Sequence, residues 1–107
     1  MDLRNICIFG IGGTGGLIGT RMIQGLRKNK AKVFFIARGA HRDAINKNGL
    51  MLESEKETVV SKPVLAALDL DEIPAPDLCI LCVKSYDLEN ACRRLKEKVT
   101  KETVIIP

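Results

Sequence analysis

The sequence contains no tryptophan, one tyrosine and three phenylalanines, so aromatic residues make up only 4% of its 107 residues. Because no platform of stacking side chains is visible, we expect no nucleic-acid partner. Long apolar runs are also missing: the longest, Leu78 to Val83, has six residues, against the roughly 18 that span a membrane. The amino-terminal residues lack the long apolar segment and cleavage site of a signal peptide. We therefore expect a cytoplasmic protein with no membrane segment.

Four cysteines are too few for the dense framework of a disulfide-stabilised secreted domain. Cys79 and Cys82 have the CxxC spacing of metal and redox sites, but three residues apart in a strand they point to opposite faces. Cys7 and Cys92, like these two, occupy predicted core positions. We therefore expect four buried free thiols and no metal site.

The charge is unevenly distributed along the chain. Residues 1–50 carry nine Lys and Arg against two Asp, a net charge of +7, whereas residues 51–107 carry eight against eleven acidic residues, a net charge of −3. The positive half also contains the glycine-rich segment, which is where a phosphate-bearing ligand is expected to bind.

Apolar runs and amphipathic segments alternate along the chain, with no repeats or low-complexity tracts. Strands are predicted at residues 6–9, 33–37, 64–68, 78–83 and 103–106, and helices at residues 14–28, 40–47 and 86–99. Residues 50–52 and 58–60 predict an inserted β-hairpin. This alternation predicts one α/β domain over residues 1–107, a Rossmann-like, doubly wound parallel sheet.

Within the helices, spacing predicts which residues face the core. In the first helix Ile18, Met22 and Leu26 form the inward stripe. In the last helix the predicted inward stripe consists of Leu88, Cys92, Leu95 and Val99.

The first candidate site is the glycine-rich segment that follows the first strand, Gly10-Ile11-Gly12-Gly13-Thr14-Gly15. In this GxGxxG pattern the first glycine allows a tight turn, the second lets the backbone approach a pyrophosphate, and the third lets helix and strand pack closely. The positive end of the helix that follows then holds the phosphates. A mononucleotide P-loop is excluded because the sequence has no Gly-Lys dipeptide; the remaining alternative is a glycine-rich turn without a ligand.

The second candidate is Arg38, at the end of the second predicted strand and 23 positions after Gly15. Domains that bind NAD place an acidic residue near this point to accept hydrogen bonds from the ribose hydroxyls. A guanidinium cannot accept a hydrogen bond but can bind a phosphate through paired donors. Arg38 therefore predicts NADP(H), the alternative being a solvated surface arginine.

The third candidate is Lys84, directly after the strand that contains Cys82 and Val83. The carboxyl ends of parallel strands meet at one edge of a doubly wound sheet, around the point where ligands bind. Lys84 is thus expected near Arg38 and the glycine turn, bridging cofactor and substrate, or else is a plain exposed lysine. The only histidine, His41, starts a short helix, where a surface or capping role is favoured.

Four segments together resemble the amino-terminal domain of the ketopantoate reductase (2-dehydropantoate 2-reductase) family. They are the glycine segment from Ile8 to Gly15, Ala37-Arg38-Gly39-Ala40-His41, Asn48-Gly49-Leu50, and the segment from Asp77 to Tyr86, which includes Val83-Lys84-Ser85-Tyr86. The resemblance implies NADPH-dependent reduction of the 2-keto acid ketopantoate to pantoate, on the pathway to pantothenate and coenzyme A. It implies that residues 10–15 bind the pyrophosphate, that Arg38 binds the 2′-phosphate, and that Lys84 lies beside the nicotinamide half.

The family's catalytic lysine, its acidic substrate-binding residue and its helical carboxyl-terminal domain have no counterpart before Pro107. We therefore expect no catalytic residue in this chain, and a chain that is part of a larger reductase, inactive by itself and with a homodimer as a candidate assembly. Two alternatives stay open: the cofactor domain of another NADP-dependent 2-hydroxy acid or opine-type dehydrogenase, and a nucleotide-sensing domain without chemistry. Arg38 counts against the sensor, which usually carries an acidic residue there.

Overall fold

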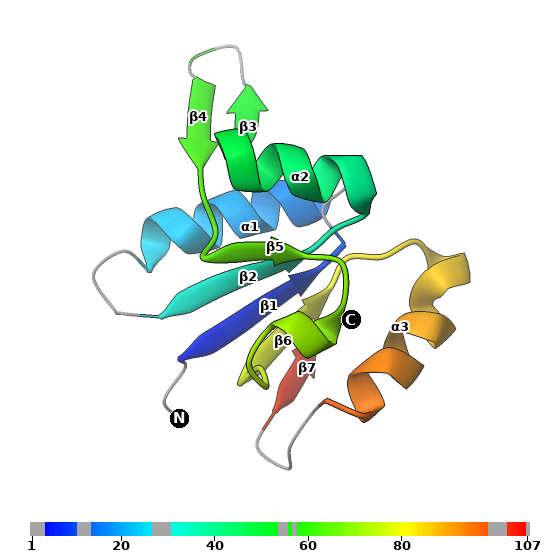
Figure 1. Ribbon diagram of the computed structural model, residues 1–107. Coiled ribbons are helices and arrows are strands. Elements are labelled where there is room, and N and C mark those ends of the chain that lie inside the picture. The colour runs from blue at the N-terminus through cyan, green and yellow to red at the C-terminus, as the bar shows by residue number, and fades with distance from the viewer. Residues whose placement is uncertain are drawn as a thin grey trace.

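A computed structural model describes residues 4–10, 14–26, 31–53, 56, 58–98 and 103–106 of the chain. Figure 1 shows a twisted sheet with helices on both faces. The strands are β1 (Asn5–Phe9), β2 (Lys32–Ile36), β3 (Leu50–Glu53), β4 (Thr58–Ser61), β5 (Leu65–Ala67), β6 (Leu78–Leu81) and β7 (Val104–Ile106). The helices are α1 (Thr14–Gly25), α2 (Gly39–Asn48) and α3 (Leu88–Lys96), with short 3-10 turns η1 (Leu70–Glu72) and η2 (Ser85–Asp87).

Five of these strands form one parallel sheet in the order β5-β2-β1-β6-β7. Counted along the chain, the parallel strands therefore lie in the order 3-2-1-4-5, which is the start of the Rossmann order. The predicted α/β, doubly wound fold is confirmed. The strand order reverses between β1 and β6, and in folds of this kind ligands bind at the carboxyl ends of the strands beside that point.

The two faces of the sheet are buried by different helices, because successive side chains of a strand point to opposite faces. Ile6 and Ile8 of β1 pack with Ile45 of α2 and with the apolar stripe of α1. Cys7 and Phe9 of the same strand pack instead with Ala91 and Leu95 of α3. Figure 1 accordingly shows α1 and α2 on one face of the sheet and α3 on the other.

The predicted hairpin is also present: β3 and β4 pair antiparallel, with Leu50 opposite Ser61. It projects beyond α2 at the rim of the molecule (Figure 1). Its base is joined to α1 by a buried hydrogen bond of 3.1 Å from the Ser61 hydroxyl to the Thr20 hydroxyl. The hairpin therefore lies on the side of α1 and α2, away from α3.

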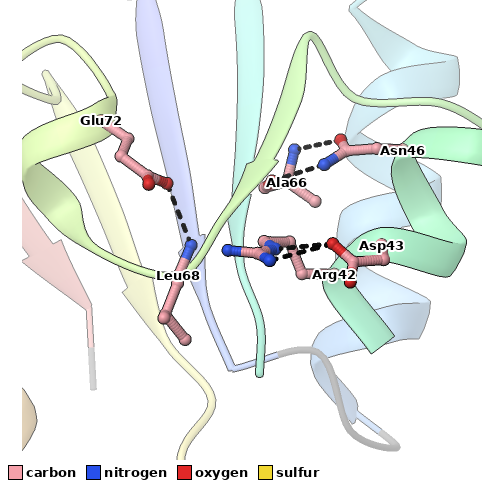
Figure 2. Close-up of polar contacts among 6 residues, drawn as sticks. All are labelled: Arg42, Asp43, Asn46, Ala66, Leu68 and Glu72. Carbon is pink, nitrogen blue, oxygen red and sulfur yellow. Dashed lines mark hydrogen bonds and ion pairs between the residues drawn. The ribbon is translucent and has the colours of Figure 1, made fainter. Parts of the chain in front are cut away.

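Edge strand β5 is joined to α2 through the side chain of Asn46, as Figure 2 shows. The Asn46 amide donates to the Ala66 carbonyl at 2.8 Å, and its oxygen accepts from the Ala66 N–H at 2.8 Å. Two residues on, the Leu68 N–H donates to the Glu72 carboxylate at 3.2 Å, at the end of the strand. All three bonds satisfy backbone groups at or just after an edge strand, and the two made by Asn46 hold α2 against the sheet.

The last helix differs from its prediction. Residues 85–87 form the 3-10 turn η2, so α3 begins at Leu88 rather than at Tyr86. Its buried residues are Ala91 and Leu95, while Leu88 is 37% exposed. Cys92 is exposed and Cys82 is half-buried, so the prediction of four buried thiols is confirmed for Cys7 and Cys79 and was wrong for the other two. Val99 lies outside the described residues.

The other boundaries differ by a few residues. The first helix ends at Gly25, short of the predicted residue 28, and the fourth parallel strand ends at Leu81 rather than Val83. Within the described part of the chain, no helix combines the length and apolar character needed to cross a membrane.

Candidate functional site

The turn after β1 has a backbone conformation that requires glycine. Gly10 has φ of +97° and donates its N–H to the Ile36 carbonyl at 3.1 Å. A Cβ at this residue would lie 3.0 Å from the carbonyl oxygen of Cys82. Gly10 therefore lets the chain turn sharply at the carboxyl end of β1 while β2 and β6 lie close on either side.

Gly15 brings the start of α1 against this turn. A Cβ placed on Gly15 would lie 1.9 Å from the carbonyl oxygen of Gly10 and 3.0 Å from the Cβ of Cys82. This is the close helix–strand approach expected of the third glycine in the motif. Ile11, Gly12 and Gly13 lie outside the described residues; Thr14 is the first residue of α1, and its side chain is likewise outside the description.

A cleft of about 990 Å³ opens at the carboxyl ends of the parallel strands. It is lined by residues that follow four different strands. These include Gly10 after β1, Ala37 and Arg38 after β2, Leu68 and Asp69 after β5, and Val83 and Lys84 after β6, together with Phe9, the last residue of β1. The remaining wall comes from η2 and α3, through Tyr86, Asp87, Asn90, Ala91 and Arg94. The structure thus brings Gly10, Arg38 and Lys84 together along one cleft.

Arg38 is the residue that precedes α2, and its side chain is 87% exposed. Its Nη2 lies 3.3 Å from the Oδ2 of Asp87, a side chain that reaches the cleft from the far wall. Among the described residues, Asp87 is the ion-pair partner of Arg38. The sequence reasoning did not select Asp87, because its distance of 49 residues from Arg38 conceals a contact made only in the fold.

Arg94 is a second cleft residue that the sequence reasoning missed. Its guanidinium carbon lies 5.1 Å from the centre of the Phe9 ring, within the range of a cation–π contact. The same guanidinium donates to the Leu68 carbonyl at 2.9 Å and to Asp69 at 3.0 Å. It therefore ties α3 to the segment after β5, and Phe9, Leu68, Asp69 and Arg94 all line the cleft.

Lys84 is exposed and contributes to the cleft with Tyr86, whose side chain is 81% exposed. The backbone between them is fixed by the Asp87 N–H, which donates to the Lys84 carbonyl at 2.8 Å. His41 also lines the cleft and is exposed, in the first turn of α2. Lys84, Tyr86 and His41 thus add exposed polar side chains to the lining of the cleft.

The cysteines near the cleft are free thiols. Cys7 and Cys79 are buried and lie opposite each other in β1 and β6. A hydrogen bond with Cys79, together with burial, raises the pKa of Cys7 well above its ordinary value. Burial raises the pKa of Cys82, which lines the cleft. The raised pKa values favour the protonated form of Cys7 and Cys82, which is a poor nucleophile and a poor metal ligand.

Comparison with known proteins agrees with the geometry. The family model described as "Ketopantoate reductase PanE/ApbA" matches residues 6–107. The chain belongs to this family.

Among ketopantoate reductases, the 2-dehydropantoate 2-reductase of Mesorhizobium japonicum is 32% identical over 101 residues. The match covers 94% of this chain and 30% of that relative, so the chain spans less than a third of the relative's length. The crystal structure of 2-dehydropantoate 2-reductase from Porphyromonas gingivalis W83 superposes with a TM-score of 0.87 at 28% identity, over 98% of this chain and 38% of that one. D-mandelate dehydrogenase with NADH and anilino(oxo)acetate gives a TM-score of 0.73 at 26% identity, over 95% of this chain and 32% of that one.

Proposed function

We propose that this chain is the NADPH-binding domain of a 2-dehydropantoate 2-reductase, an enzyme that reduces 2-dehydropantoate to pantoate in the synthesis of pantothenate and coenzyme A. The observation that carries the proposal is the convergence of Gly10, Arg38 and Lys84 on one cleft at the point where the strand order reverses. Membership of the ketopantoate reductase family supports the substrate.

The residues present fit a dinucleotide with an additional phosphate. Gly10 and Gly15 let the amino end of α1 pack directly against the end of β1, beside Gly10 in the cleft. The amino end of a helix is a site that binds phosphate groups, so we assign the pyrophosphate to it. Arg38 supplies charged donors for a 2′-phosphate. Lys84, at the other side of the cleft, is the residue we assign to the nicotinamide half.

A nicotinamide cofactor supplies a hydride to the substrate carbonyl when it is bound. The role of this chain's residues is to bind and orient that cofactor at the carboxyl edge of the sheet. We place the acid that protonates the substrate oxygen in the remaining length of the enzyme, since the chain spans 30% of its Mesorhizobium relative. We also infer a cytoplasmic location, which free, buried thiols such as Cys7 and Cys79 favour.

A second candidate keeps the fold and changes the substrate. The likeness to D-mandelate dehydrogenase, at 26% identity, favours a reductase of some other 2-oxo acid. In that case the cleft would hold the cofactor in the same way, and the difference would lie in the part of the enzyme that binds the acid.

The test is turnover by the full-length protein, followed through the loss of NADPH absorbance. We expect kcat/KM to be highest with 2-dehydropantoate and lower with phenylglyoxylate, the 2-oxo acid that corresponds to mandelate. Equal or greater activity on phenylglyoxylate would favour the second candidate. No NADPH oxidation with any 2-oxo acid would contradict both.

The assignment of Arg38 is tested by Arg38→Asp, which replaces a phosphate-binding cation with an acceptor for ribose hydroxyls. We expect the NADPH-to-NADH ratio of kcat/KM to fall about tenfold or more. An unchanged ratio would show that Arg38 does not contact the cofactor.

A further inference from the structure

Asp87 lies where a 2′-phosphate bound to Arg38 would meet a negative charge. It ends η2 and precedes α3, on the wall of the cleft opposite α2. Its Oδ2 is 3.3 Å from the Nη2 of Arg38. The Asp87 side chain is 31% exposed, against 87% for Arg38, and its backbone N–H is bonded to Lys84. The carboxylate is thus the more fixed member of the pair.

The Asp87 carboxylate does not serve as the cap of the helix that follows it. Although Asp87 precedes α3, its side chain makes no capping hydrogen bond to the helix. The other lining arginine, Arg94, is likewise paired with an acid, Asp69. Three lysines and arginines line the described part of the cleft. Arg38 and Arg94 each form an ion pair there, and Lys84 does not. Each cleft arginine is therefore already paired with a carboxylate that lines the same cleft.

A carboxylate in this place acts oppositely on the two forms of a nicotinamide cofactor. A 2′-phosphate carries up to two negative charges, must compete with Asp87 for the guanidinium, and is repelled by the carboxylate at a separation of a few ångströms. A ribose 2′-hydroxyl, in contrast, can donate a hydrogen bond to a carboxylate at the cleft, as it does in domains that bind NAD.

We propose that Asp87 sets the cofactor specificity of this site, by holding Arg38 in an ion pair and so reducing the preference for a 2′-phosphorylated cofactor over its unphosphorylated form. The inference rests on the proposed function, since it presumes that the cleft binds a nicotinamide dinucleotide. It extends that function by making specificity the balance of two opposed side chains, Arg38 and Asp87. The site would then accept NADH more readily than Arg38 alone predicts.

The test is Asp87→Asn in the full-length protein, with dissociation constants for NADPH and NADH measured by calorimetry at one fixed salt concentration. Asparagine preserves the size of the side chain and removes its charge. We expect NADPH to bind about fivefold more tightly and NADH about twofold more weakly, so that the affinity ratio changes about tenfold. In an Arg38→Ala background, the gain in NADPH affinity should fall below twofold, because no guanidinium remains to be released.

The matched control is Glu89→Gln, which removes one negative charge two residues farther along. Glu89 pairs with Arg93 on the exposed face of α3 and does not line the cleft. We expect it to change the NADPH-to-NADH affinity ratio by less than twofold. A comparable change in both variants would indicate a general charge effect and overturn the proposal.

Three further outcomes also decide the matter. If Asp87→Asn weakens NADPH binding, the carboxylate orients Arg38 for the phosphate, and the proposal is wrong. If the parent protein prefers NADPH but Asp87→Asn leaves the NADPH-to-NADH affinity ratio unchanged, Asp87 does not set the specificity. The proposed function is then unaffected. If the parent protein binds neither cofactor, the proposed function itself is contradicted.

Discussion

Among the described glycines, Gly15 is the one at which the fold has the least room for an added side chain. A Cβ there would lie 1.9 Å from the carbonyl oxygen of Gly10, so α1 would have to move away from β1. We expect Gly15→Ala to destabilise the protein by about 3 kcal/mol or more, because the contact is with backbone that cannot rotate away. Thermal unfolding and urea titration of the full-length variant measure this loss.

Gly25, at the last position of the same helix, is the control. A Cβ there meets nothing within 4 Å. We expect Gly25→Ala to leave stability unchanged or to raise it by up to about 1 kcal/mol, since alanine favours helix. Equal effects of the two substitutions would mean that helix and strand do not approach each other as closely as the structure shows.

Single residues also show where sequence reasoning succeeds. The glycine turn, Arg38 and Lys84 could all be placed on one edge of the sheet, because each follows a buried strand and parallel strands end on the same side. Asp87 and Arg94 could not, since their importance comes from contacts with Arg38 and Phe9 that no local spacing encodes.

At the scale of elements, α2 is held to β5 by one side chain. Asn46 makes two hydrogen bonds to Ala66, which is 1% exposed. We expect Asn46→Ala to cost about 1–3 kcal/mol, because it leaves the N–H and the carbonyl of a buried edge residue without a partner. Denaturant unfolding gives the free energy, and hydrogen exchange at Ala66 reports the local effect.

Asn48→Ala, at the exposed end of the same helix, provides the comparison. We expect it to change stability by less than about 0.5 kcal/mol. If both asparagines can be replaced at the same small cost, the Asn46 hydrogen bonds do not stabilise the attachment of α2 to the sheet.

The face of α3 shows the limit of pattern reasoning for an element. Spacing of the large apolar residues predicted an inward stripe through Leu88, Cys92 and Leu95, yet Ala91 is buried and Cys92 is exposed. Arg94 also faces the sheet, with its guanidinium carbon 5.1 Å from the centre of the buried Phe9 ring. A count of hydrophobic residues does not anticipate a charged side chain at that place.

Across the whole molecule, the alternation of strands and helices sufficed to predict the doubly wound sheet, since a crossover between parallel strands needs a helix or a long connection. The hairpin β3–β4 was equally predictable from two short apolar runs around a charged segment. The sequence contained no signal for the two ion pairs inside the cleft, Arg38 with Asp87 and Arg94 with Asp69. Each pair joins residues that are far apart in the chain and meet only in the folded structure.

The charge of the whole molecule leads to a last prediction about salt. Residues 1–50 carry a net charge of +7, and a 2′-phosphate adds up to two negative charges to the cofactor. Raising the salt concentration from about 0.1 M to about 1 M shortens the screening length from about 10 Å to about 3 Å. We therefore expect NADPH affinity of the full-length protein to fall about threefold to tenfold more than NADH affinity over this range.

This excess depends on a local contact and not on net charge alone. In Arg38→Ala the two cofactors should lose affinity in parallel, because the extra phosphate then has no guanidinium partner. Arg93→Ala removes the same charge on the exposed face of α3, away from the cleft, and should preserve the difference. Calorimetric titration at several salt concentrations measures both slopes. Parallel slopes in the parent protein would place the 2′-phosphate in solvent, and Arg38 would then have no part in its recognition.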